Sequence, residues 1–280
     1  MILDGKVTAA ALEAQLKERL SGLKANGYLP KLAIVLAGSS KPSVMYAQFM
    51  KKVAAGYGIE AALYAKPDDV AEEELGGLIK ELNTDNSVTG ILMMMPLPGH
   101  LQAEHLIELI DPDKDIDGLT TMNAGRLFSG KDGFFGCTPR AVMEILKHYD
   151  ISVDGKEAVV VGRSNVIGKP VAAMLMQKNA TVTVCHSHTR NLRDITCSAD
   201  ILVAAVGKPD AIQADMVKPG AIVIDVGINR AGGKTVGDVD YEAVLPIAGA
   251  VTPVPGGVGA VTTTMVIESL VKAGEKACGM

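Results

Sequence analysis

The sequence predicts a two-domain α/β protein built on parallel sheets. Its 280 residues reach the length at which a single core stops growing, roughly 250–300 residues. Apolar strand-like runs alternate with amphipathic helical windows, the pattern of right-handed βαβ units. A loop-rich stretch at residues 111–136 interrupts this alternation. We therefore expect residues 1–138, with about 262–280, to form the first domain and residues 139–261 the second.

In the first half, residues 6–26 are expected to form a helix that Gly27 stops, because apolar residues recur on one face. Pro42 should lead into the next helix, and the string 96–99 (PLPG) should end the last strand. The other elements expected here are strands 32–36, 59–65 and 88–94 and helices 43–57 and 71–82.

The second half repeats the alternation. Thr138 is expected to cap a helix that begins at Pro139 and runs to about Tyr149. The last helix, about residues 261–272, is expected to leave the second domain and pack back on the first. The other elements expected are strands 158–161, 181–185, 201–206 and 221–226 and helix 168–178.

Composition narrows the class of protein. The formal charge is 27 − 32 = −5 with no basic block, which gives no electrostatic basis for nucleic-acid binding. No apolar run approaches the roughly 18–20 residues that span a bilayer, and the first residues lack the apolar core of a signal peptide. The four cysteines form no CxxC pair, which favours reduced thiols in the cytoplasm and no zinc or other metal site.

Residues 159–170, VVVGRSNVIGKP, predict a strand, a glycine turn and a helix start. Glycines let a backbone approach a pyrophosphate, and a helix N-terminus supplies N–H groups and a positive dipole end. Ser164 replaces the middle glycine of GxGxxG, and the turn is one residue longer. A tight strand–helix turn without a ligand is the alternative.

The following strand favours NADP as the cofactor. NAD sites usually carry an acid about 20 residues on that binds the ribose 2′-OH, whereas residues 186–190 here are HSHTR. A carboxylate would repel a 2′-phosphate, and Arg163 and Ser187 can donate to one. We interpret His186 and His188 as adenosine-side or surface residues.

Two later strand ends, residues 204–209 and 225–229, also fit a cofactor cleft, since ligands bind at the carboxyl edge of open α/β sheets. Asp225 has two interpretations. It either belongs to that cleft or is a buried acid that holds the turn at Gly227.

Four further segments stand out: 42–46 (PSVMY), 90–98 (GILMMMPLP), 111–118 (DPDKDIDG) and 252–259 (TPVPGGVG). Together with the 162–164 (GRS) turn, they resemble the ordered motifs of the bifunctional methylenetetrahydrofolate dehydrogenase/methenyltetrahydrofolate cyclohydrolase family. The resemblance runs from residues 3–6 (LDGK) to the final helix, essentially the whole chain.

The resemblance implies an N-terminal folate-binding domain, an NADP-binding Rossmann domain, a tetrahydrofolate substrate and a homodimer. Tyr46 would stack on the pterin and Asp117 would bind its ring nitrogens. The residues implied in substrate binding are Tyr46, Met93, Met94, Met95, Asp117, Pro253, Val254, Pro255, Gly256 and Gly257. Those implied in NADP binding are Gly162, Arg163, Ser164, Ser187 and Ile228. The structural alternatives are a core tyrosine, a turn acid and a purely structural proline–glycine loop.

Two departures from the family fall at its catalytic positions. The family has a catalytic Lys one turn after the Tyr, where this chain has Met50, and a partner Gln where it has Met94. Lys51 and Lys52 follow, but they point about 100° and 200° further round the helix. Ordinary apolar filling is the alternative for both methionines.

We therefore expect the catalytic set Tyr46, Met50, Met94 and Asp117 to support hydride transfer, which mainly needs alignment. Hydrolysis of the methenyl cation needs proton movement, and losing its Lys costs roughly 10²–10⁴ in rate. The hypothesis is an NADP-dependent methylenetetrahydrofolate dehydrogenase with weakened or lost cyclohydrolase activity. The alternatives are a fully bifunctional enzyme, a related-pterin dehydrogenase and a non-catalytic NADP- or folate-binding paralogue.

Overall fold

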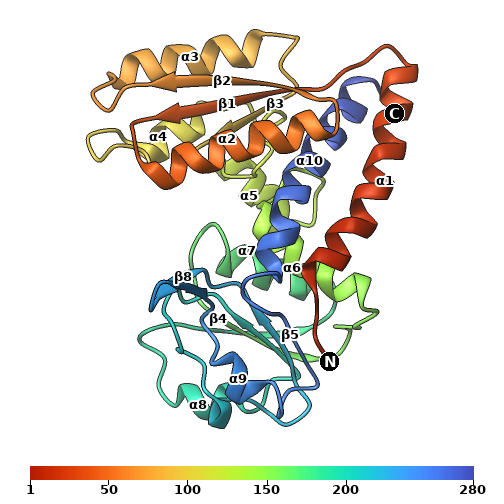
Figure 1. Cartoon of the computed structure of the whole chain (residues 1–280), viewed down its shortest axis with the longest axis vertical. Helices are drawn as coiled ribbons and strands as arrows, with labels where there is room; N and C mark the ends of the chain where they lie inside the picture. The colour runs from red at the N-terminus through yellow and green to blue at the C-terminus, as the bar shows by residue number, and fades with distance from the viewer. The chain divides into compact units, whose positions relative to one another are not determined.

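The computed structural model describes all 280 residues, which divide into two compact units. The five-stranded unit, named for its main sheet, comprises Met1–Leu12 and Gly136–Met265. The three-stranded unit comprises Glu13–Phe135 and Val266–Met280. Two long helices, α1 (Gly5–Ala25) and α10 (Val258–Ala277), contribute residues to both units (Figure 1). No helix is both long enough and apolar enough to cross a membrane.

The three-stranded unit is built on a parallel sheet of order β2-β1-β3. Its strands are β1 (Lys31–Ala37), β2 (Glu60–Lys66) and β3 (Gly90–Met93), and its helices besides α1 and α10 are α2 (Lys41–Gly56), α3 (Glu72–Thr84), α4 (Ala103–Glu108) and α5 (Thr121–Phe128). Val35 and Met93 point to one face and form a core with Leu75 and Ile79 of α3. Helix α2 packs against β1 and β2, and Figure 1 shows α2 and α3 on opposite sides of the sheet.

The C-terminal helix belongs to the three-stranded unit from Val266 onward. Arg19 of α1 donates to Glu268 at 3.0 Å and to both carboxylate oxygens of Glu275 at 2.8 and 2.6 Å. Lys272 of α10 donates to the Gly133 carbonyl at 2.9 Å. The prediction that the last helix packs on the first domain is confirmed.

The five-stranded unit contains a parallel sheet of order β10-β7-β6-β4-β5. Its strands are β4 (Glu157–Val161), β5 (Thr181–Cys185), β6 (Ile201–Ala204), β7 (Ile222–Asp225) and β10 (Ala250–Val251), with a separate hairpin of β8 (Asn229–Ala231) and β9 (Lys234–Val236). The helices are α6 (Cys137–His148), α7 (Gly168–Gln177), α8 (Leu192–Thr196), α9 (Tyr241–Val244) and the short 3₁₀ helix η1 (Ala214–Met216). Strand β5 is added on one side of β4, and the later strands β6, β7 and β10 are added on the other side. This change of side is typical of a doubly wound Rossmann fold. The predicted fold class is confirmed.

Three expectations need correction. Residues 1–12, assigned above to the first domain, pack with the five-stranded unit, because Leu3 N–H donates to Val251 O at 2.9 Å and extends the β10 edge. Helix α6 begins at Cys137 with Gly136 as its N-cap, so Thr138 lies inside the first turn and does not cap it. Helix α5 lies within residues 111–136, the stretch that we expected to be loop-rich.

Candidate active site

The predicted cofactor turns meet at the carboxyl edge of the five-stranded sheet. Strand β4 pairs with β5 on one side and β6 on the other, so the sheet reverses at β4. Ala205 N–H donates to Val161 O at 2.8 Å, which holds the turn after β6 against the turn after β4. This is the topological switch point at which open α/β sheets bind ligands.

The glycine turn after β4 needs its glycines. Gly162 has φ +139, and a side chain there would overlap the Ala205 carbonyl. A side chain at Gly168 would overlap the Gly162 carbonyl, so both residues must lack a Cβ for the turn and α7 to pack this closely. Ser164 Oγ accepts from Ile167 N–H at 3.1 Å and Gly168 N–H at 3.3 Å. Ser164 therefore shapes the turn that leads into α7, and the Arg163 side chain lies exposed beside it.

The other predicted cofactor residues lie at the same edge. Ser187 follows β5 and is exposed, and the 186–190 turn is closed by the Thr189 hydroxyl, which accepts from His186 N–H at 2.8 Å. Ile228 follows β7 and is 70% exposed. Its apolar side chain is therefore exposed to solvent at an edge of the sheet that polar turns line.

Two buried carboxylates hold the loops of this edge in place. Asp238 accepts from the backbone N–H groups of Val206 at 2.5 Å, Gly207 at 2.9 Å and Lys208 at 3.0 Å. Its Oδ1 also accepts from Asn229 Nδ2 at 2.8 Å. Asp238 therefore ties the loop after β6 to the loop after β7.

Asp225, at the end of β7, accepts from the N–H groups of Gly227 at 2.9 Å, Asp238 at 2.9 Å and Val239 at 3.0 Å. These bonds match the structural interpretation, an acid that holds the Gly227 turn. Burial raises the pKa of Asp225 to about 6, although the backbone N–H donors act in the opposite direction. The negative charge of Asp238 adds to the increase.

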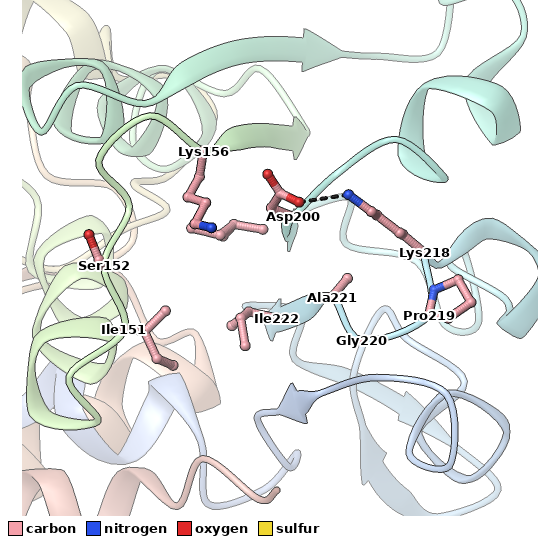
Figure 2. Close-up of a pocket in the computed structure, with 10 residues that line it drawn as sticks. Ile151, Ser152, Lys156, Asp200, Lys218, Pro219, Gly220, Ala221 and Ile222 are labelled. Carbon is pink, nitrogen blue, oxygen red and sulfur yellow. Dashed lines mark hydrogen bonds and ion pairs between the residues drawn. The ribbon is translucent and has the colours of Figure 1, made fainter.

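A cavity of about 230 Å³ opens at the other edge of this sheet, at the amino ends of β4, β6 and β7 (Figure 2). Lys218 donates to Asp200 at 2.7 Å on its wall, and Lys156 lies beside them. Because parallel α/β sheets bind cofactors at their carboxyl ends, this cavity is separate from the dinucleotide edge.

In the three-stranded unit, α2 presents a buried face and an exposed face. Met50 is 0% exposed and shares the buried stripe with Ser43, Ala47 and Ala54. Tyr46 is half-buried. A methionine at position 50 therefore fills space that water does not reach.

The end of β3 lies beside α2. Met94 is 3% exposed, and Met93 is also buried, whereas Met95 is 42% exposed. Met94 N–H donates to Val35 O at 2.8 Å, and Ser43 Oγ donates to Met95 O at 3.3 Å. The buried face of α2 and the strand end that carries Met94 are thus joined by a direct hydrogen bond.

The loop that carries Asp117 lies against β3. Ile91 N–H donates to Lys114 O at 2.8 Å, and Ile91 forms an isolated parallel bridge with Asp115. Asp117 is half-buried two residues further on. The structure therefore gathers the β3 end, α2 and the Asp117 loop around one part of the three-stranded unit.

The Pro253–Gly257 loop lies in the five-stranded unit, between β10 and α10. Gly5 N–H donates to Gly256 O at 2.8 Å, and a side chain at Gly5 would overlap the Gly257 carbonyl. Gly5 and the loop therefore pack backbone to backbone. This contact gives a physical reason for glycine in the LDGK segment near the N-terminus.

Family models cover most of the chain. Residues 3–117 match the catalytic domain of tetrahydrofolate dehydrogenase/cyclohydrolase, and residues 136–278 match its NAD(P)-binding domain. The chain belongs to the tetrahydrofolate dehydrogenase/cyclohydrolase family. The resemblance that the sequence motifs indicated is confirmed.

Individual members of the tetrahydrofolate dehydrogenase/cyclohydrolase family align over nearly the full length. The bifunctional protein FolD of Campylobacter curvus is 50% identical over 275 residues, which are 98% of this chain and 96% of the relative. The crystal structure of the bifunctional FolD of Campylobacter jejuni has a TM-score of 0.97 at 42% identity and covers 99% of both chains. FolD of Trypanosoma brucei, solved with NADP and an inhibitor, has a TM-score of 0.94 at 33% identity and covers 100% of this chain and 99% of its own.

Sequence reasoning missed three residues that this family member uses to shape its loops: Asp115, Asn123 and Asp238. Asp115 lies in an Asp-rich segment in which we assigned a role to Asp117 alone. Asn123 follows Thr120 by three residues, and Thr120 Oγ accepts from Asn123 N–H at 3.3 Å, so a helix cap was present in the pattern. For Asp238 we find no local sequence signal, since the backbone groups that it holds, Val206–Lys208, lie 30 to 32 residues earlier.

Proposed function

We propose that this chain is a 5,10-methylenetetrahydrofolate dehydrogenase whose cyclohydrolase activity is severely weakened or lost. The observation that carries the proposal is the pair Met50 and Met94. Both occupy positions where the family motif has a catalytic Lys and its Gln partner, and both are buried, at 0% and 3% exposure. A thioether neither accepts nor donates a proton at neutral pH.

The cofactor is NADP, which accepts a hydride when bound. The chain's residues fit it: the glycine turn at Gly162 leads into the N-terminus of α7, a ten-residue helix, and a helix N-terminus favours a pyrophosphate. Arg163 and Ser187 are exposed beside that turn, and no carboxylate occupies residues 186–190. Those donors would hold a ribose 2′-phosphate without like-charge repulsion.

The substrate we propose is a tetrahydrofolate derivative. Asp117 would accept paired N–H bonds from the amino-pyrimidinone edge of the pterin, and Tyr46 would stack on its face. The loop Pro253–Gly257 would provide a rigid wall. Met94 and Met95 would line the pocket with apolar, polarisable side chains. Met93, which the sequence also suggested for this pocket, instead packs in the core against α3.

The two reactions of the family make different demands. In the dehydrogenase step a ring-nitrogen lone pair drives hydride loss from the methylene carbon and leaves the methenyl cation. Alignment of the donor carbon supplies most of this catalysis. In the cyclohydrolase step a water must lose a proton, and losing the group that manages protons costs roughly 10²–10⁴ in rate.

Neighbouring lysines do not compensate for Met50. Lys51 and Lys52 are both exposed, whereas Met50 lies on the buried stripe of α2. Their side chains leave the helix about 100° and 200° away from that stripe. A proton carrier on the exposed face has no access to the position that Met50 fills.

A second candidate is the full bifunctional enzyme. It is favoured by the relatives, which are named bifunctional protein FolD, the one from Campylobacter curvus being 50% identical over almost the whole chain. In that case another group would activate the water in place of a lysine at position 50.

We also propose that the protein is a cytoplasmic homodimer. Strand β5 is the last strand of its sheet and has one edge without a strand partner, and Met176 and Val184 near it are exposed. An exposed strand edge pairs readily with a second copy. Analytical ultracentrifugation should give twice the 29.2 kDa chain mass, and a monomer at micromolar concentration would contradict this.

Restoring the family's residues tests the proposal. The Met50→Lys/Met94→Gln variant should gain methenyltetrahydrofolate hydrolysis by roughly 10²–10⁴ over wild type, measured as decay of methenyl absorbance. Met45→Lys, on the exposed face of the same helix, is the matched control and should gain nothing. Wild-type hydrolysis that already keeps pace with hydride transfer would contradict the proposal and favour the bifunctional candidate.

A further inference from the structure

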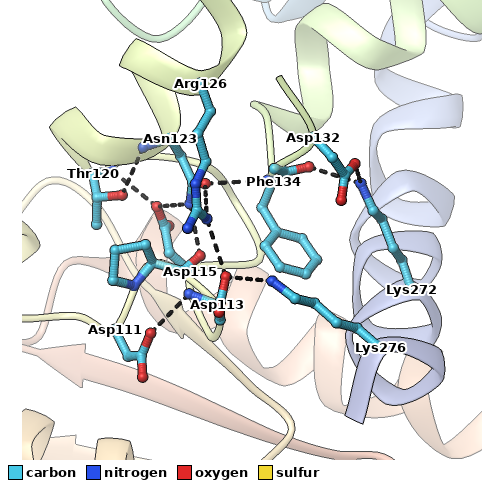
Figure 3. Close-up of polar contacts among 12 residues, drawn as sticks. Asp111, Asp113, Asp115, Thr120, Asn123, Arg126, Asp132, Phe134, Lys272 and Lys276 are labelled. Carbon is cyan, nitrogen blue, oxygen red and sulfur yellow. Dashed lines mark hydrogen bonds and ion pairs between the residues drawn. The ribbon is translucent and has the colours of Figure 1, made fainter. Parts of the chain in front are cut away.

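The segment around Asp117 is fixed by a buried carboxylate two residues before it (Figure 3). Asp115 is 1% exposed. Its Oδ1 accepts from Leu119 N–H at 3.0 Å, and its Oδ2 accepts from Thr120 N–H at 2.8 Å. The Asp115 carboxylate therefore binds the backbone of Leu119 and Thr120, on the far side of Asp117 in the sequence, and fixes the segment between them.

A buried amide completes this support. Asn123 is 0% exposed, and its Nδ2 donates to Asp115 Oδ2 at 3.0 Å and to Pro112 O at 2.8 Å. Its Oδ1 accepts from Phe134 N–H at 3.3 Å and from Arg126 Nη1 at 3.2 Å. Asn123 thus connects the start, the middle and the end of the loop. Buried polar groups persist when they are hydrogen-bonded, as every one of these is.

The backbone on both sides of Asp117 leaves it little freedom. Ile116 is buried against Gly90 of β3, where a side chain on the glycine would overlap it. Gly118 has φ +65 and donates to Asp115 O at 3.1 Å, and a Cβ at Gly118 would crowd the backbone of Phe134 and Phe135. Asp117 therefore sits between two anchored neighbours.

The outer part of the loop is tied to α10. Lys276 donates to Asp113 at 2.7 Å and Arg126 donates to the same oxygen at 3.0 Å, which together hold the pKa of Asp113 below its usual range. Lys272 donates to Asp132 and lies over the Phe134 ring (Figure 3). These contacts are exposed, in contrast to those of Asp115 and Asn123.

We propose that Asp115 and Asn123 are positioning residues that hold the Asp117 carboxylate in the orientation that binds the pterin. The inference rests on the proposed function and deepens it. Asp115 is too buried to meet the substrate, so it acts through Asp117. Asp115 and Asn123 affect affinity for the folate substrate. They do not affect affinity for NADP, because the edge that binds NADP is formed by the strands of the five-stranded sheet.

The test compares KM for methylenetetrahydrofolate with KM for NADP, using the dehydrogenase assay. In Asp115→Asn the new amide presents N–H groups to Thr120 N–H or to the Asn123 amide, and we expect at least a tenfold rise in the folate KM. The NADP KM should stay within twofold. Asp132→Asn, at the exposed end of the same loop, is the control and should change neither value.

Two further variants separate positioning from general structural support. In an Asp117→Ala background, adding Asp115→Asn should raise the folate KM no further, because Asp115 acts through the missing carboxylate. The exchange Asp115→Asn/Asn123→Asp restores one donor–acceptor pair and should recover part of the folate KM. Additive effects, or equal rises in both KM values, would overturn the inference.

The outcomes also separate this inference from the proposed function. A wild-type protein that oxidises methylenetetrahydrofolate normally, with an Asp115→Asn variant that keeps its folate KM, overturns the inference alone. A wild-type protein that neither oxidises methylenetetrahydrofolate nor binds tetrahydrofolate in calorimetry overturns both.

Discussion

Single side chains decide the chemistry that this fold can perform. Met50 keeps roughly the length of a lysine but removes its proton and charge, and its burial on α2 leaves no room for water to take over. Met94 removes the amide that would have oriented a lysine. We expect hydride transfer to survive such losses, because it depends mainly on alignment of the donor carbon.

Asp238 should matter to cofactor binding although it is buried. In Asp238→Asn an amide N–H group would face the backbone N–H groups of the Val206–Lys208 loop, which now donate to the carboxylate. Hydrogen bonds to a charged group contribute about 1.5–3 kcal/mol, so we expect the NADP KM to rise by roughly 10- to 100-fold. Steady-state kinetics checks this.

Asp240→Asn is the matched control, because Asp240 caps α9 through Ala243 N–H and does not contact the cofactor loops. If Asp238→Asn lowers the melting temperature and leaves the NADP KM unchanged, Asp238 only stabilises the fold.

At the level of elements, the start of α1 and the Pro253–Gly257 loop depend on each other. Gly5→Ala would place a methyl group inside the Gly257 carbonyl, and overpacking of this kind costs about 1–3 kcal/mol. We expect a lower melting temperature and a higher KM for the folate substrate, since the loop is the proposed wall of that pocket. Thermal unfolding and kinetics measure the two effects.

Gly77→Ala is the comparison variant, since Gly77 lies in α3 with nothing within 4 Å of an added methyl group. Alanine there should stabilise the helix by about 0.4–1 kcal/mol. A Gly5→Ala variant as stable and as active as Gly77→Ala would show that the contact can relax.

Elements with a clear hydrophobic period were predictable from the sequence. Every strand of the two parallel sheets except β10, which we did not predict, lies within a few residues of its expected range, and Pro42 lies in the first turn of α2 as expected. Helix α5 was missed because its eight residues are rich in Gly, Thr and Asn, and the Thr120 cap identifies it only in retrospect. The N-terminal twelve residues were misassigned because a bridge between Ile2 and Val251 has no local pattern.

The same distinction applies to the candidate site. The glycine turn after β4 carries its chemistry in a contiguous motif, so the sequence pointed to it. Asp115, Asn123 and Asp238 act through partners that the fold brings together, up to 32 residues apart for Asp238 and Val206. No spacing rule identifies such contacts in a single sequence.

At the level of the whole molecule, Asp225 should make stability depend on pH. Its folded pKa, about 6, lies above the ordinary aspartate value of 3.8, so the folded state binds the proton more tightly. The stability this supplies is complete below about pH 4 and is lost as pH rises through about 6, up to about 3 kcal/mol. The stability of wild type relative to Asp225→Asn should therefore fall between pH 4 and 7.

Urea unfolding at several pH values measures this difference, and Asp69→Asn, an exposed acid in the other unit, is the control. A difference between wild type and Asp225→Asn that stays constant from pH 4 to 7 would show that Asp225 titrates alike in the folded and unfolded states.

The central claim is that this family member forms the methenyl product and does not hydrolyse it. The most direct measurement is to incubate wild-type protein with methylenetetrahydrofolate and NADP and to record methenyl absorbance before and after acidification. We predict methenyltetrahydrofolate that accumulates without acid, in step with NADPH. If NADPH forms but the methenyl absorbance appears only after acid, the product has passed on to formyltetrahydrofolate, and the role assigned to Met50 is contradicted.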